Sequence, residues 1–202
     1  VGLLLYLAHL LSSLIVGLLF RFYKPGQGPR RKDGSPAQFQ TASFPAAFTR
    51  SVTGALQSTL NICAFILFFT VAVRMLTLSG LLSAAAGLLS RLLFPLGLSQ
   101  EWAERLITGV LEVSTGVSSL TDGALSGRMS MAAFMLGWAG LSVHCQVLAF
   151  LGGSGLSLRT YLAGKLLHGV LSSLLVYGMA SLLPLEVSVS AYLARQTEAI
   201  AH

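Results

Sequence analysis

Residues 98–123 read LSQEWAERLITGVLEVSTGVSSLTDG, and the fold depends on how this stretch is interpreted. Ser99 can cap a helix whose first turns carry acidic residues, which suit the positive end of the helix dipole. Such a helix reaches Glu112, and residues 117–121 are then too few to cross a bilayer. We therefore predict a helix that enters the membrane, breaks and continues as a short second limb. The alternative is an amphipathic helix at the membrane surface, followed by an exposed loop.

The composition around this stretch is that of a membrane protein. The chain has 202 residues, of which 54% are hydrophobic and 10% are charged, and its mean hydropathy is +0.76. A soluble domain carries about 25% charged residues. The composition excludes an ordinary cytosolic enzyme, a disordered protein and a small secreted module held by disulfides.

Four apolar stretches come close to the length of about 20 residues that a membrane-spanning helix needs. They are residues 2–20, 51–73, 129–158 and 158–183, the third of which is interrupted by the glycines of residues 152–155. Residues 76–94 are apolar but shorter. The predicted fold class is all-α, a polytopic bundle of membrane helices with broken or re-entrant helices.

The charged residues divide the chain into parts. Most of the excess of Lys and Arg behind the net charge of +6 lies in residues 21–50. Because Lys and Arg accumulate in cytoplasmic loops, we expect this loop in the cytoplasm. We expect no nucleic-acid partner, since no aromatic residues for base stacking are interleaved with the basic residues of 24–32. The predicted organisation is a membrane helix ending a preceding half, a basic flexible linker, a membrane domain and a surface tail, over residues 1–22, 23–48, 49–183 and 184–202.

Polar residues inside apolar stretches are candidate site residues, because a polar group in hydrocarbon needs a partner. Glu112 is the foremost, since a buried carboxylate must be protonated, paired or hydrated. It is either a hydrogen-bond acceptor or proton carrier for a ligand, or it forms an ion pair with Arg128 or Lys165. Ser114 and Thr115 follow it directly and can supply hydroxyl groups.

Further polar residues lie on three other helices. Asn61 shares a face with Gln57, and a second group further along the chain comprises Ser142, His144 and Gln146. Each group either contacts a ligand or hydrogen-bonds neighbouring helices. On the last long helix, Tyr161, Lys165, His168 and Ser172 share a face, and Lys165 can extend to the membrane surface. We expect His9, Cys63 and Cys145 to be packing residues, and no cofactor or metal site.

Several segments resemble a known family. Residues 109–116, GVLEVSTG, resemble a signature of nucleoside-recognition, or Gate, domain membrane proteins. Residues 137–147, GWAGLSVHCQV, and residues 162–168, LAGKLLH, are similar to segments of sporulation integral membrane proteins of the YlbJ type. Residues 7–23 resemble the last helix of the first half of those proteins. The resemblance implies a fold related to the concentrative nucleoside transporters, with two inverted halves of which the second is present here.

Two hypotheses for function follow, both for a multi-pass protein of the bacterial inner membrane. The first is a sporulation-linked transporter or permease that binds a small polar solute near the membrane midplane, at Asn61, Glu112, Ser114, Thr115, Ser142, His144 and Gln146. The second is a non-transporting scaffold for spore assembly, whose polar faces are helix-packing contacts. Besides the lipid bilayer, expected partners are a missing N-terminal half, a second copy or a related Gate protein, because the chain begins inside an apolar run and is expected to be a fragment.

An enzyme is not expected. Ser114, His144 and Glu112 are the residue types of a nucleophile, a base and an orienting acid. They come without a GxSxG or HExxH motif. A membrane-embedded hydrolase requires Ser114 within hydrogen-bonding reach of His144.

Overall fold

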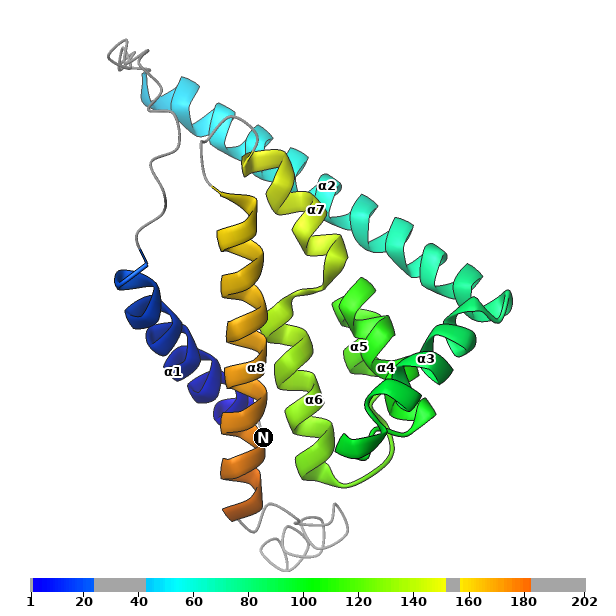
Figure 1. Cartoon of the computed structure of the whole chain (residues 1–202). Coiled ribbons are helices and arrows are strands. Elements are labelled where there is room, and N and C mark those ends of the chain that lie inside the picture. Colours follow the sequence, from blue (N-terminus) through cyan, green and yellow to red (C-terminus); the bar gives the residue numbers. More distant parts are fainter. Residues whose placement is uncertain (1, 24–42, 152–156, 183–202) are drawn as a thin grey trace, which may run out of the picture.

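The computed structural model describes residues 2–23, 43–151 and 157–182, and all regular structure in these ranges is helical (Figure 1). The elements in chain order are α1 (Gly2–Arg21), α2 (Phe44–Leu78), α3 (Leu81–Leu92), the 3-10 turn η1 (Phe94–Leu96), α4 (Gln100–Leu111), α5 (Val113–Ser118), α6 (Leu125–Trp138), α7 (Gly140–Leu151) and α8 (Leu158–Leu182). The predicted tail and most of the predicted linker lie outside the described residues.

Four helical stretches of the described chain are long and apolar enough to cross a membrane. They are Gly2–Arg21, Phe44–Leu78, Leu125–Leu148 and Leu158–Leu182. The number agrees with the sequence prediction, but the second stretch has 35 residues and begins with Pro45 in its first turn, ahead of the predicted start at Ser51. Many large apolar side chains on these helices are exposed, as lipid-facing residues are.

The centre of the molecule is the contact between α6 and α8, which lie side by side in Figure 1. Gly137 and Gly169 allow this approach, because a Cβ atom on Gly137 would lie 2.6 Å from the Cα atom of Gly169. On the other side of α8, α1 packs through a buried hydrogen bond between the Ser12 and Ser172 hydroxyls, whose oxygens lie 2.6 Å apart. Small residues thus replace large apolar ones where these membrane helices meet.

α4 and α5 form a helical hairpin that reverses direction at Glu112. The backbone of Glu112 is extended, with φ −143° and ψ 113°, between the last residue of α4 and the first of α5. Gly116 on α5 lies directly against the backbone of Gly109 on α4. Residues seven apart in one continuous helix lie about 10 Å from each other, so this contact requires a reversal. The predicted break is present, and the second limb returns along the first.

A second break separates α6 from α7, and the sequence did not predict it. Ala139 has φ 80° and Gly140 has φ 78°, which places both in the left-handed region. The break lies against the tip of the α4–α5 hairpin, because a Cβ atom on Gly140 would lie 3.0 Å from the backbone nitrogen of Val113. The Trp138 indole N–H also donates to the carbonyl oxygen of Val110, over 3.3 Å. Two helix breaks therefore meet inside the molecule.

Candidate functional site

The Glu112 side chain forms the tip of the hairpin and is fully buried. One carboxylate oxygen accepts the backbone N–H of Ser114 over 3.0 Å, and the other accepts that of Thr115 over 2.6 Å. The side chain therefore caps the N-terminus of α5, where backbone N–H groups lack partners within the helix. Both donors favour an ionised carboxylate.

The ion pair predicted as an alternative for Glu112 is not formed among the described residues. Arg128 instead donates from Nε to the carbonyl oxygen of Leu120, over 2.7 Å. The ion pairs of the described chain join Arg105 to Glu101 and to Asp122. The backbone of the hairpin itself thus supplies the contacts that hold Glu112.

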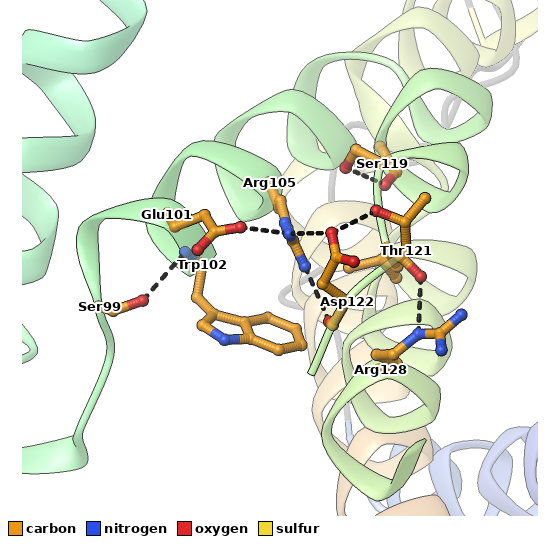
Figure 2. A network of polar contacts seen from close by, with 10 residues as sticks. Ser99, Glu101, Trp102, Arg105, Ser119, Thr121, Asp122 and Arg128 are labelled. Atoms are coloured by element: carbon orange, nitrogen blue, oxygen red, sulfur yellow. Dashed lines mark hydrogen bonds and ion pairs between the residues drawn. The ribbon is translucent and has the colours of Figure 1, made fainter. Parts of the chain in front are cut away.

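The polar end of the hairpin lies away from this tip, at the start of α4 (Figure 2). Ser99 accepts the backbone N–H of Trp102, and Arg105 Nη1 donates to the carbonyl oxygen of Asp122 over 3.0 Å. The side chains of Glu101 and Asp122 are 68% and 78% exposed. This hairpin base is the part of the hairpin suited to water, whereas the tip is buried.

The first turns of α7 carry buried polar side chains beside the tip. The Ser142 hydroxyl is fully buried and has no hydrogen-bond partner in the described structure. His144 is 1% exposed, and its Nδ1 lies 3.0 Å from the Tyr161 hydroxyl on α8, while its Nε2 has no partner. The Gln146 amide nitrogen is likewise buried without a partner. Buried polar atoms are nearly always hydrogen-bonded, so this group is unusual.

The structure separates the predicted site residues into three places. Glu112 and Thr115 lie at the hairpin tip with the buried residues of α7, whereas the Ser114 side chain is exposed. Asn61 is exposed on α2, where its carboxamide oxygen accepts from Gln57 over 3.4 Å. The described contacts of His144 are with Tyr161 and Trp138 rather than with Ser114.

Sequence reasoning missed two aromatic partners of His144. The Trp138 ring packs edge-on against its imidazole, with centroids 4.4 Å apart, and Tyr161 contacts it from α8. Tyr161 belonged to the predicted polar face of α8, but nothing in the sequence indicated that α7 would meet that face. Nothing in the sequence indicated a role for Trp138, because the break next to it was not predicted.

Lys165 lies on α8 between two contacts that fix its position relative to α6 and α7. Tyr161, four residues earlier, contacts His144, and Gly169, four residues later, contacts Gly137. No ion pair links Lys165 to an acid within the described ranges. Lys165 therefore lies at the level of the α6–α7 break without an ion-pair partner among the described residues, although the Glu112 carboxylate lies against the same break.

His9 and His168 are held in a polar contact between α1 and α8. His9 Nδ1 lies 3.4 Å from His168 Nε2 and 3.2 Å from the Ser172 hydroxyl. The described residues contain no group of three or more His, Cys, Asp or Glu side chains that could hold a metal ion. The contact joins α1 to α8, and His9 Nε2 within it is buried without a described partner.

One curated protein is similar to the chain over most of its length. The chain is 28% identical over 193 residues to the sporulation integral membrane protein YlbJ of Bacillus subtilis (strain 168). The alignment covers 87% of this chain and 47% of the relative, so the chain spans about half the length of that protein. No family model matches the sequence, and no solved structure matches it. The chain is a membrane protein related to a sporulation integral membrane protein.

Proposed function

We propose that the protein is a transporter or permease of the bacterial inner membrane, which binds a small polar solute where the hairpin tip meets the start of α7. The observation that supports this most is the pair of buried polar atoms without partners, Ser142 Oγ and His144 Nε2, beside two helix breaks. If these residues only packed helices together, their unsatisfied buried polar atoms would lower the stability of the folded protein. A bound solute with complementary groups removes that cost.

The depth of the site fits this role. α4 has 12 residues and α6 has 14. At 1.5 Å per residue, both breaks lie about 18–21 Å from the polar hairpin base. In a hydrocarbon layer about 30 Å thick, they then lie near the middle of the membrane. Carriers commonly bind their substrates at this depth, at helices that are interrupted.

Each residue has a proposed part in binding. Glu112 and Thr115 hold the tip in its turned conformation, and lone pairs of the Glu112 carboxylate not used in the cap accept from a solute hydroxyl or amine. Ser142, His144 and Gln146 offer donors and acceptors from the opposite wall. Because Glu112, Ser142 and His144 are buried, a solute reaches them only when the hairpin and α7 move apart.

The charge near the site favours an acidic solute. Lys165 lies one helical turn after Tyr161, whose hydroxyl contacts His144, and the described ion pairs are those at the hairpin base. A lysine within a membrane helix needs a counter-ion or water. A solute carboxylate or phosphate supplies the missing negative charge.

The scaffold hypothesis has support of its own. The Ser130 and Ser173 hydroxyls lie 2.8 Å apart between α6 and α8, and Ser12 pairs with Ser172 between α1 and α8. These polar residues join helices and need no solute. The two hypotheses differ most at α7, where three partnerless polar atoms gather beside the hairpin tip, whereas the α1–α8 contact has one, His9 Nε2.

A matched pair of substitutions tests the proposal. Ser142→Ala removes a hydroxyl without a partner, and Ser172→Ala removes one that is hydrogen-bonded. Because Ser142→Ala removes an unsatisfied buried group, we expect it to maintain or raise the melting temperature of the purified protein and to abolish its stabilisation by added solute. We expect Ser172→Ala to lower the melting temperature and to keep that stabilisation.

The probes are succinate, inorganic phosphate and the neutral nucleoside uridine, each added at millimolar concentration. Stabilisation by succinate or phosphate that is lost in Ser142→Ala supports an acidic solute. Stabilisation by uridine alone contradicts the argument from Lys165. If none of the three stabilises the protein, or if Ser142→Ala responds as the unchanged chain does, the binding site is rejected and the scaffold is favoured.

A further inference from the structure

The contact between α1 and α8 contains a network of polar groups inside the membrane helices. The Ser12 hydroxyl donates to the carbonyl oxygen of His9 over 3.1 Å, and the Ser12 and Ser172 oxygens lie 2.6 Å apart. His9 Nδ1 lies 3.2 Å from the Ser172 hydroxyl, and His168 Nε2 lies 3.3 Å from the His9 carbonyl oxygen. His168 directly precedes Gly169, where α8 meets α6, so the network lies in the interior of the bundle.

These contacts fix which nitrogen of His9 carries the proton. Because the Ser12 hydroxyl donates to a carbonyl oxygen, Ser172 must donate in the short contact between the two hydroxyls. Ser172 then has no proton for His9, and its oxygen accepts from His9 Nδ1. A neutral imidazole carries a proton on one nitrogen, so His9 Nε2 holds a free lone pair.

The opposite tautomer of His9 fits the network less well. With the proton on Nε2, Nδ1 is an acceptor, so Ser172 donates to it and Ser12 must donate to Ser172. Ser12 then gives up its bond to the His9 carbonyl oxygen, and a buried N–H group is left without an acceptor. The only gain is the approach of His168 Nε2 to His9 Nδ1, which at 3.4 Å is the longest of these contacts and shares its donor with the carbonyl oxygen.

His9 Nε2 is therefore a base that has no described partner. The atom is buried in the contact, so a group larger than a water molecule reaches it only when α1 and α8 separate. Ionisable side chains inside membrane helices commonly bind protons or ions. A proton is the smallest of these ligands, and it binds at Nε2 without using any atom that joins the two helices.

The charged groups around the network leave this role to imidazole. α1, α6 and α8 pack together here and contain no Asp or Glu. Lys165 lies three residues before His168 on the same side of α8, whereas Arg128 of α6 is held at the hairpin base by a backbone carbonyl oxygen. On α1, Tyr6 is exposed and Arg21 lies at the end of the helix. Among these side chains, imidazole is the type that ordinarily changes charge near neutral pH.

We propose that His9 Nε2 is a proton-binding site within the membrane part of the chain. A hydronium ion delivers the proton, an N–H bond forms at Nε2, and water leaves. The product is a positively charged imidazolium. Because the contacts with Ser172 and His168 use other atoms, they persist, and α1 stays on α8.

Nuclear magnetic resonance of the full chain with isotope-labelled histidine, in vesicles of bacterial lipids, tests the proposal. The signal lost in His9→Gln identifies His9 among the 4 histidines. We expect its proton on Nδ1 at alkaline pH and a second proton on Nε2 after acidification to about pH 4.5, well below the ordinary pKa of imidazole. A starting proton on Nε2, or an Nε2 that stays unprotonated in the acidified, folded protein, overturns the proposal.

A second measurement follows the protons that the purified chain takes up after an acid pulse, with a pH-indicator dye. His9→Gln keeps a donor for Ser172 but has no basic nitrogen, so we expect it to take up about one proton fewer per chain. Ser13→Ala is the control, since this exposed hydroxyl of α1 bonds to the Leu10 carbonyl oxygen, and it should leave the uptake unchanged. Equal uptake by His9→Gln and the unchanged chain contradicts the site. Neither measurement involves a solute, so the proton site and the proposed function fail or stand separately.

Discussion

At the hairpin tip, the Glu112 carboxylate occupies the place that a bound anion takes at many helix N-termini. Its two oxygens accept the N–H groups of Ser114 and Thr115 and leave little room for an external anion at that point. In the proposed site, an acidic group of a solute is therefore expected nearer Lys165 than Glu112. The two backbone N–H groups favour a negative charge on Glu112 that repels such a group, whereas Lys165 on α8 attracts it.

Glu112→Gln tests the cap at the scale of one residue. The amide has one acceptor oxygen where the carboxylate has two, so one backbone N–H loses its partner. We expect the free energy of unfolding in detergent to fall by about 1 kcal/mol, the usual worth of a helix cap. Tryptophan fluorescence during unfolding measures it, with Glu104→Gln on the same helix as the control. A fall of the same size in both variants contradicts a special role for Glu112.

The importance of Glu112 could be predicted from its sequence, because an acid followed by Ser, Thr and Gly interrupts an apolar run. Its partners could not. An ion pair with Arg128 or Lys165 was equally consistent with the residue types, and the extended backbone of Glu112 turns the carboxylate toward its own helix instead. Asn61 was grouped with this site because it is polar, whereas its exposure depends on how α2 packs.

At the scale of elements, the hairpin depends on two glycines that touch. A methyl group on Gly116 meets the backbone of Gly109, which cannot move aside as a side chain can. We expect Gly116→Ala to separate α4 from α5 and to lower the free energy of unfolding by about 1–3 kcal/mol, as overpacking does. The matched control is Gly178→Ala on α8, where a Cβ atom meets nothing within 4 Å. Equal melting temperatures for the two variants contradict the close contact.

The two helix breaks differ in how far the sequence reveals them. The break at Glu112 has a charged residue, and it was predicted. The break between α6 and α7 lies inside a stretch without formal charge, and Ala139 adopts a positive φ that its side chain does not favour. In the sequence, the glycines of residues 152–155 form the stronger interruption. Only the contact of Gly140 with Val113 gives the second break its physical reason.

For the whole molecule, the packing of α1 and α6 on α8 places the end of α1 and the hairpin base at opposite ends. The end of α1 lies near the start of α8, because a Cβ atom on Gly164 would contact Phe20 at 3.7 Å. Ser130, which follows the hairpin base, is instead bonded to Ser173 in the second half of α8. The end of α1 and the hairpin base therefore lie toward opposite ends of α8, and we expect them on different sides of the membrane.

This arrangement predicts opposite labelling of two cysteines. In a background of Cys63→Ala and Cys145→Ala, we expect a membrane-impermeant maleimide to label Asp122→Cys in intact cells. Because the basic loop is expected in the cytoplasm, Tyr23→Cys should react only after permeabilisation. Labelling of Tyr23→Cys in intact cells reverses the predicted orientation, and labelling of both at once contradicts the packing of α1 and α6 on α8.

The length of α2 has a consequence for the lipid that surrounds the protein. Its 35 residues make about 52 Å, and the apolar part between Arg50 and Arg74 makes about 34 Å, slightly more than the hydrocarbon thickness of about 30 Å, so the ends of the helix extend into the head groups. Longer acyl chains let it stand more upright, and shorter ones increase its tilt. Since α7 packs on α2, each change of tilt also shifts the wall that faces Glu112. Bilayer thickness is thereby an external influence on the geometry of the interior.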